Sequence, residues 1–294
     1  MEVRSLRDRW FETVNIALLA LLSAAVLYPL LFVISASVSN PSAVLAGDMW
    51  LWPVDISLTG YRKVLENKEL LTGYGNTILY TAVGTTVNLI MTVLAAYPLS
   101  RSQLWGRNAI TALLVFTMFF SGGLIPAYMV VKTLGLNNTM WALILPGAVS
   151  VWNIFITRTF FQSSIPGELQ EAASIDGCSD TGILLRIVLP LSAPILAVMV
   201  LFYAVGHWNA YFNALIYLTD RKQYPLQLFL REILIQGQME QMVNSGDSSH
   251  AQAIMDEEAI KYAAVVVTNL PIFMLYPFLQ KYFVKGVMIG ALKG

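Results

Sequence analysis

Long apolar stretches alternate with short polar segments along the whole chain. A helix needs about 20 mainly apolar residues to cross roughly 30 Å of hydrocarbon. Six stretches of about this length or longer contain no Asp, Glu, Lys or Arg, and they cover residues 16–36, 78–100, 109–131, 139–157, 187–219 and 262–280. The pattern therefore predicts an all-α membrane protein with six transmembrane helices, which puts both termini on the same side.

Basic residues in the polar segments indicate the orientation. Cytoplasmic segments of membrane proteins carry an excess of Lys and Arg. Arg4, Arg7 and Arg9 precede the first stretch, and residues 101–108 hold two Arg, whereas residues 132–138 hold one Lys. We therefore expect both termini in the cytoplasm. The first stretch is longer than the roughly 7–15 apolar residues of a signal peptide, so we interpret it as an uncleaved helix.

The composition agrees with a membrane location. The chain is 56% hydrophobic and only 12% charged, whereas about 25% of the residues of a soluble domain are charged. So little charge excludes a soluble enzyme, a disordered chain and a nucleic-acid binder with a basic footprint. The single cysteine, Cys178, forms no intrachain disulfide and argues against a cysteine-based metal site. We expect a single transmembrane domain over residues 1–294, without a bound metal.

Two of the segments that this orientation places outside are long, and they cover residues 39–77 and 220–261. Long connections are usually either functional or disordered. Trp50 and Trp52 in the first segment suit the membrane interface, and residues 244–249 in the second have the composition of a flexible tip. We expect an outward loop to contact a partner.

The apolar stretches lack the groups that drive transport. They contain no acidic residue, although ion-coupled transporters usually keep Asp, Glu or His inside the membrane. His207 is expected at the interface, near the outer end of the fifth stretch. The chain also has no phosphate-binding loop of the form G-x-x-x-x-G-K-[ST]. Energy for uphill transport must therefore come from another polypeptide, and we expect no enzymatic activity in this chain.

Neutral polar and aromatic side chains lie in or beside the stretches. Amide groups are costly against lipid, so they should face the interior of the bundle. There they serve either as interhelical hydrogen bonds or as a path for an uncharged or hydroxyl-rich solute, and the sequence leaves both readings open. The aromatic rings of Trp208 and Tyr211 could pack inside the protein, anchor it at the membrane interface or stack on a sugar, and the sequence leaves these roles open. These candidate path residues are Asn88, Asn153, Trp208, Asn209, Tyr211, Asn213 and Asn269.

Residues 158–186, between the fourth and fifth stretches, carry the most specific pattern. Pro166 can open a helix in its first turn. Residues 168–175 favour a helix, and Gly177 can end it in a left-handed conformation. The segment therefore predicts a short cytoplasmic helix outside the bilayer.

This segment resembles the EAA motif of bacterial ABC importer permeases, E-A-A-x-x-D-G followed by I-x-L-P. Nine residues separate Gly177 from Ile187, as the motif requires, and Cys178 replaces the usual small residue. The matching residues are Glu171, Ala172, Ala173, Asp176, Gly177, Ile187, Leu189 and Pro190. Residues 96–101, 119–126, 206–209 and 277–294 resemble the carbohydrate-uptake permeases of the LplC/YtcP type, relatives of the maltose-type permease.

The resemblance implies how such a chain is coupled to ATP. In the family, the motif helix docks in a groove on a cytoplasmic ATPase subunit, and the ATPases, not the permease, bind ATP and Mg. Glu171 would make the polar contact, Ala172 and Ala173 would permit close approach, and Gly177 would set the turn. Asp176, Leu189 and Pro190 belong to the same coupling motif. The tail residues Gly290, Lys293 and Gly294 resemble a tail that reaches between the ATPases.

The resemblance also implies a location and partners. We expect a multi-pass protein of the bacterial cytoplasmic (inner) membrane, surrounded by lipids and paired with a second, homologous permease. Two ATPase subunits, or a homodimer, would bind inside, and a solute-binding protein would meet loop 220–261 outside. The solute would be a carbohydrate, either an oligosaccharide or a polysaccharide fragment, and no nucleic acid is involved. The alternatives are a stand-alone secondary transporter or channel, and an assembly subunit that transports nothing.

Overall fold

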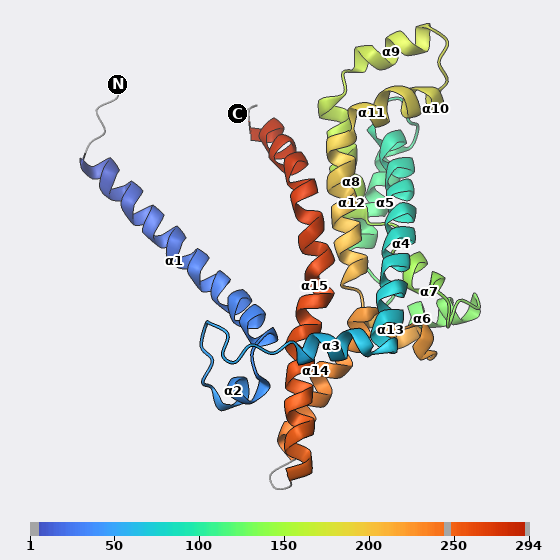
Figure 1. Ribbon diagram of the computed structural model, residues 1–294. Helices are drawn as coiled ribbons and strands as arrows, with labels where there is room; N and C mark the ends of the chain where they lie inside the picture. The colour runs from blue at the N-terminus through green and yellow to red at the C-terminus, as the bar shows by residue number, and fades with distance from the viewer. Residues whose placement is uncertain (1–5, 244–247, 292–294) are drawn as a thin grey trace. The chain divides into compact units, whose positions relative to one another are not determined.

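The computed structural model describes residues 6–243 and 248–291, and these residues form helices and connections without a strand (Figure 1). The predicted all-α class is confirmed. The longest helices are α1 (Leu6–Ser37), α4 (Lys68–Ser100), α14 (Leu226–Val243) and α15 (Ser248–Ala291). Helices of intermediate length are α5 (Arg107–Phe119), α6 (Leu124–Thr133), α8 (Val151–Ser164), α9 (Gly167–Ile175) and α12 (Ala193–Trp208).

Short helices connect these elements. They are α2 (Pro41–Ala46), α3 (Thr59–Glu66), α7 (Trp141–Ile144), α10 (Asp180–Ile183), α11 (Leu189–Leu191) and α13 (Phe212–Tyr217). Two 3₁₀ turns, η1 (Leu145–Gly147) and η3 (Arg221–Gln223), and a π-helical turn, η2 (Leu184–Val188), complete the described chain.

Within the described residues, two helices are long and apolar enough to cross a membrane, namely Arg9–Ser37 of α1 and the whole of α4. Three bent pairs pass the same criterion together: α5 with α6 (112°), α7–η1 with α8 (54°), and the α10–α11 segment with α12 (82°). Counting each pair as one crossing gives up to five. The sixth predicted stretch, residues 262–280, lies in α15. After Met274, the structure describes the side chain of Pro277 and no other in that stretch.

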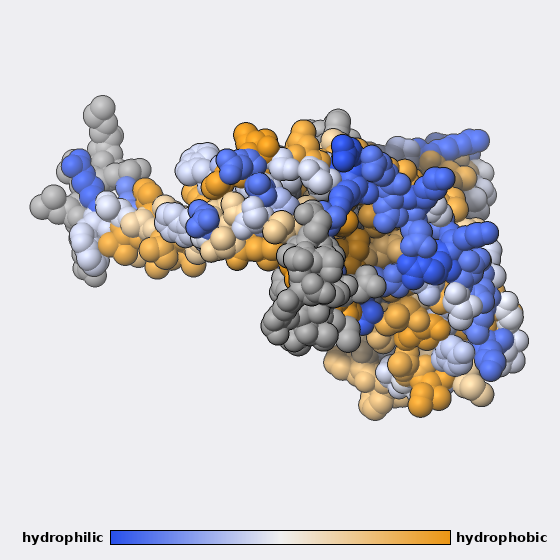
Figure 2. Space-filling view, turned by 60° about the horizontal axis from the view of Figure 1, so that its bottom comes forward, coloured by the Kyte–Doolittle hydropathy of each residue, from blue (hydrophilic) through white to orange (hydrophobic). Residues whose placement is uncertain are grey.

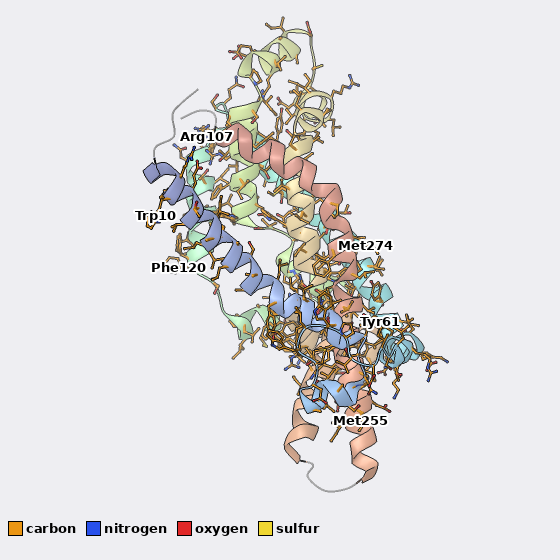
Figure 3. The ribbon with its side chains drawn as sticks, turned by 60° about the vertical axis from the view of Figure 1, so that its left-hand side comes forward. Trp10, Tyr61, Arg107, Phe120, Met255 and Met274 are labelled. Carbon is orange, nitrogen blue, oxygen red and sulfur yellow. The ribbon has the colours of Figure 1, made fainter. Side chains whose placement is uncertain are left out.

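The third predicted stretch is a bent pair and not one straight helix. Phe120 leaves α5 in an extended conformation, and Gly123 has φ +86° and ψ 173°. Side chains rarely tolerate a positive φ, so glycine suits this position. Pro126 follows in the first turn of α6, where the missing N–H costs no helical hydrogen bond. Figure 3 labels Arg107 and Phe120 at the two ends of α5.

The chain divides into two compact units, residues 1–70 with 230–270 and residues 71–229 with 271–294. In the first unit, the segment 39–77, which is predicted to lie outside, contains α2 and α3, and α3 packs closely on α15. A Cβ at Gly60 would lie only 2.3 Å from the Ala259 carbonyl oxygen, so the contact requires glycine. Lys63 forms an ion pair with Asp256, and the Tyr61 hydroxyl lies 2.7 Å from Ser37 Oγ (Figure 3).

The second unit has a hydrophobic core formed by α4, α8, α9 and the segment from α10 to α12. Figure 1 shows α9 and α10 at one end of α4, α8 and α12, with α6, α7 and α13 at the opposite end. Ala96, Ile154, Ile183, Val188 and Met199 are fully buried in this core. The core therefore connects the predicted cytoplasmic helix to the long apolar helices.

Much of the remaining apolar surface is exposed, as the broad orange areas of Figure 2 show. None of the most hydrophobic window of α1 is buried, and α5 buries no residue at all. Exposing such surfaces to water costs free energy, whereas exposing them to lipid does not. The exposed apolar helices are those expected of a membrane protein.

Candidate functional site

A row of polar contacts joins α4 to α12 in the second unit. The Asn88 Oδ1 lies 2.6 Å from His207 Nε2, and the Thr92 and Tyr203 hydroxyls lie 2.6 Å apart. One turn further, Ala96 and Met199 are both fully buried. Residue numbers increase along α4 while those of their partners on α12 decrease, so the two helices run antiparallel. Two polar layers between them are followed by an apolar layer.

Asn88 connects a third segment to this row. Its side chain is 1% exposed, and its Nδ2 donates to the Gly147 carbonyl at 2.7 Å. Gly147 ends the 3₁₀ turn where the α7–α8 pair bends, so its carbonyl has no regular helical partner. Asn88 therefore gives the free carbonyl at the bend a hydrogen-bond donor and also contacts α12 through His207.

Gly84 makes the approach of His207 to α4 possible. A Cβ at Gly84 would stand 2.5 Å from two atoms of the His207 ring. Gly84, Asn88, Thr92 and Ala96 recur every fourth residue, so they form one face of α4. Small residues at this spacing let membrane helices pack closely and bring their polar groups together.

A small cavity lies beyond His207 at the α13 end of the same unit. Its volume of about 20 Å³ is enough for one water molecule. Its lining is Thr77, Tyr80, Leu143, His207, Ala210, Asn213, Ala214 and Pro225. Trp208 stands nearby on α12, is 5% exposed, and packs edge-on against Tyr74 with ring centroids 5.7 Å apart. The ring of Trp208 is thus used for packing in this conformation.

The structure brings together only some of the predicted path residues. Asn88 and Trp208 are buried, and Asn213 is half-buried in the small cavity. Asn153 is also buried, and its backbone N–H donates to Ser150 Oγ at the start of α8. These four residues belong to the same unit.

The other three predicted path residues lie elsewhere. Asn209 and Tyr211 are exposed just after α12, and the Asn209 side chain donates to the Val205 carbonyl of its own helix. Asn269 belongs to the first unit and bonds to the Val265 carbonyl. For Asn209 and Asn269 the bond observed is therefore a local one.

The sequence did not reveal the contacts of His207 with Asn88 and Gly84, and its expected position at the interface stays a prediction. Sequence reasoning also missed Gly84, Thr92 and Tyr203. The signal for them was the four-residue spacing of small and polar residues on α4. That spacing identifies a contact face, but it does not say which residue of which helix lies opposite.

The predicted cytoplasmic helix is present as α9, with Pro166 one position before its first residue. Gly177 ends it with φ +80°, and the N–H groups of Gly177 and Cys178 donate to the carbonyls of Ser174 and Ala173. This is the predicted left-handed termination.

One face of α9 is buried and the other is open. Ala173 and Gln170 face the core, whereas Glu171 and Ala172 are exposed and Ile175 is 87% exposed. An exposed isoleucine beside a small residue and a carboxylate suits a surface that another protein covers. Asp176 caps the helix end and is exposed as well.

The second half of the motif lies where the chain turns toward α12. Leu189 and Pro190 form α11, directly after the π-helical turn. Leu189 and Cys178 pack against the same hydrophobic cluster that contains Ala173, Val188 and Met199. Both halves of the motif therefore join one core with α12.

The C-terminal candidates are only partly within the described residues. Gly290 belongs to α15, and Lys293 and Gly294 lie outside the described residues. Within the searched residues, no group of three or more His, Cys, Asp or Glu side chains could hold a metal ion.

Comparisons with known proteins place these features in a family. The family described as "Binding-protein-dependent transport system inner membrane component" matches residues 1–289. Protein LplC of Bacillus subtilis (strain 168) is 43% identical over 97% of this chain and 96% of its own length.

Two further relatives carry substrates in their names. The "Polygalacturonan/rhamnogalacturonan transport system permease protein YtcP" of the same organism is 40% identical over 98% of this chain and 100% of its own length. A solved structure described as "a bacterial ABC transporter involved in the import of the acidic polysaccharide alginate" matches with a TM-score of 0.87 and 34% identity, covering 96% of this chain and 100% of that chain.

We expect Asn88→Leu to destabilise the protein by about 1–3 kcal/mol, because it leaves the Gly147 carbonyl and His207 without their partner. Thermal unfolding in detergent measures the loss. Asn209→Leu is the control, because Asn209 is exposed and bonds only within its own helix, and it should change stability by less than about 0.5 kcal/mol.

A double-mutant cycle of Asn88→Leu with His207→Leu should give a coupling of about 0.5–3 kcal/mol, since the two side chains are in contact. Strictly additive effects of the two substitutions on stability would contradict the contact between Asn88 and His207.

Proposed function

Because the chain belongs to the family of binding-protein-dependent transport system inner membrane components, we propose that it carries an oligosaccharide of an acidic polysaccharide across the membrane. As a permease of an ABC transporter it is a non-enzymatic inner-membrane component, and ATP is hydrolysed by partner subunits. The observation that carries the proposal is α9, an exposed motif helix that shares a core with α12, together with the two relatives that are named for acidic polysaccharides.

The charge pattern of the apolar stretches is compatible with an acidic solute. The six apolar stretches contain no Asp or Glu, so a polyanion meets no like charge along them, and like charges at close range are costly. Hydroxyl and amide groups such as those of Tyr203, Thr92 and Asn88 suit a solute rich in hydroxyls, once the helices move apart.

The topology proposed is six crossings with both termini in the cytoplasm, in a single transmembrane domain over residues 1–294. The distribution of Arg and Lys supports this orientation. Each bent helix pair then counts as one crossing, and part of α15 supplies the last.

The partners proposed are a second homologous permease, two ATPase subunits and an extracytoplasmic solute-binding protein. In this arrangement Glu171, Ala172 and Ile175 of α9 meet the ATPase, and Asp176 and Gly177 fix the end of that helix. The tail residues Gly290, Lys293 and Gly294 are proposed to contact the same ATPases, which hold ATP and Mg. Loop 220–261 faces the binding protein.

A solute assay tests the substrate class. Proteoliposomes that hold the complete complex and its binding protein should take up galacturonate or alginate oligosaccharides when ATP is supplied. A neutral oligosaccharide of equal length should be taken up at least about tenfold more slowly, because a difference of about 1.4 kcal/mol in recognition produces that ratio. Equal uptake of the neutral compound would remove the acidic class from the proposal.

Charge reversal on α9 tests the coupling role. Glu171→Lys should abolish both uptake and solute-stimulated ATP hydrolysis while membrane insertion persists, because the polar contact to the ATPase is replaced by the opposite charge. Glu66→Lys is the matched control on an exposed surface position, where the Arg62–Glu66 pair contributes little. Normal solute-stimulated hydrolysis in Glu171→Lys would contradict the docking role.

A further inference from the structure

A polar cavity among the described residues lies beside α9 and is lined in part by Glu171 and Ile175, which are exposed on that helix. Its volume is about 510 Å³. One wall is the connection from α4 to α5, with Arg101, Gln103 and Arg107, and the other is formed by α8 and α9, with Gln162 and Glu171. Two cations therefore face a single anion across the cavity.

Both arginines are held in place by their neighbours. The Arg101 guanidinium lies 5.7 Å from the centre of the Tyr97 ring, and Tyr97 is itself buried. Arg107 Nη1 donates to the Arg101 carbonyl at 3.5 Å, and Gln162 Nε2 donates to the Ser100 carbonyl at 3.3 Å. These contacts orient the connection.

Within the described residues, neither arginine has a carboxylate within 4.0 Å. The start of α5 adds to the positive potential, because Gly106 provides no side-chain cap for its first N–H groups. The described lining of the cavity therefore carries more positive than negative charge and suits a further anion.

The positions of the two arginines along the chain indicate the level of the cavity relative to the membrane. Ser100 ends one apolar stretch and Arg107 stands two residues before the next, which starts at residue 109. Both guanidiniums therefore lie beside the ends of apolar stretches of membrane-crossing length, at the level of lipid headgroups. Figure 3 shows Arg107 at the end of α5 that is remote from Phe120.

The same connection carries a membrane-interface residue. Trp105, between the two arginines, is 95% exposed, and α5 directly after it buries no residue. Exposed tryptophan is enriched where apolar helices meet the headgroup region. A protein partner alone would not explain an exposed indole that leads into an apolar helix without a buried residue.

We propose that this cavity binds the phosphate of an anionic phospholipid from the cytoplasmic leaflet, held by Arg101 and Arg107. Basic pockets between helices on the cytoplasmic side are suited to such headgroups. Guanidinium groups bind phosphate oxygens through charge-assisted hydrogen bonds. Because α9 forms the opposite wall, a bound lipid positions this coupling helix. The lipid therefore controls how strongly the solute stimulates ATP hydrolysis. The inference rests on the proposed orientation.

Native mass spectrometry of the purified complex tests the site. In nanodiscs of phosphatidylcholine with added phosphatidylglycerol, the wild-type complex should retain phosphatidylglycerol. Arg101→Gln and Arg107→Gln should each lower that retention about fivefold, because each removes one of the two guanidiniums that bind the phosphate inside the cavity. Arg9→Gln is the matched control, because Arg9 is an exposed basic residue outside the cavity and on the same proposed side. It should leave retention unchanged.

Three results would overturn the proposal. Retention could be unchanged in both cavity variants. Inorganic phosphate could displace the lipid from the wild type, which would identify a site for free phosphate. The variants could bind the ATPase more weakly at unchanged lipid retention, which would identify an acidic segment of the ATPase as the occupant. Retention is read without solute or ATP, so a failure of the transport function would not imitate any of these results.

Discussion

A backbone polar group inside an apolar environment needs a partner from the protein, and this requirement decides what lies beside the bend before α8. Helices satisfy their own backbone, but a bend frees carbonyl and N–H groups that lipid cannot bond. At the bend before α8, the Gly147 carbonyl accepts from Asn88 and the Asn153 N–H donates to Ser150. The bend is therefore stable only because α4 places an amide beside it.

The same amide joins the bend to α12 through His207. This contact depends on Gly84, which has no side chain to keep the imidazole away. One turn further, the Thr92–Tyr203 pair fixes the register, and below it Ala96 and Met199 begin the apolar core. That core also contains Ala173 of α9 and Val188 of the π-helical turn. A displacement of α9 by an ATPase would therefore be passed to α12 through close-packed side chains, which transmit strain because they leave little empty space.

The sequence predicted the local features well, because each depends on neighbouring residues. The limits of α9 and the left-handed Gly177 follow from proline, glycine and helix-forming residues within a short segment. The long apolar helices follow from the absence of charge. Bends were harder to predict, since Gly122, Gly123 and Pro126 mark a break without giving its angle of 112°.

The path residues were predicted least well. Asn88 and Asn209 are the same residue type in similar apolar surroundings, yet one is buried at the centre of three segments and the other is exposed. Burial of this kind is decided by which helices pack together, and that depends on contacts between residues more than 100 positions apart, such as Asn88 and His207. No pattern within one helix contains that information.

The central claim is that α9 meets the ATPase while its buried face moves α12. Photo-crosslinking from a single position tests it most directly. Ala172→Cys, in a Cys178→Ser background and labelled with a photoreactive maleimide, should form adducts with the ATPase subunit in the assembled complex. The same label at Leu113→Cys, on the exposed surface of α5, should react with lipid. An assembled complex in which position 172 yields no ATPase adduct would contradict the account.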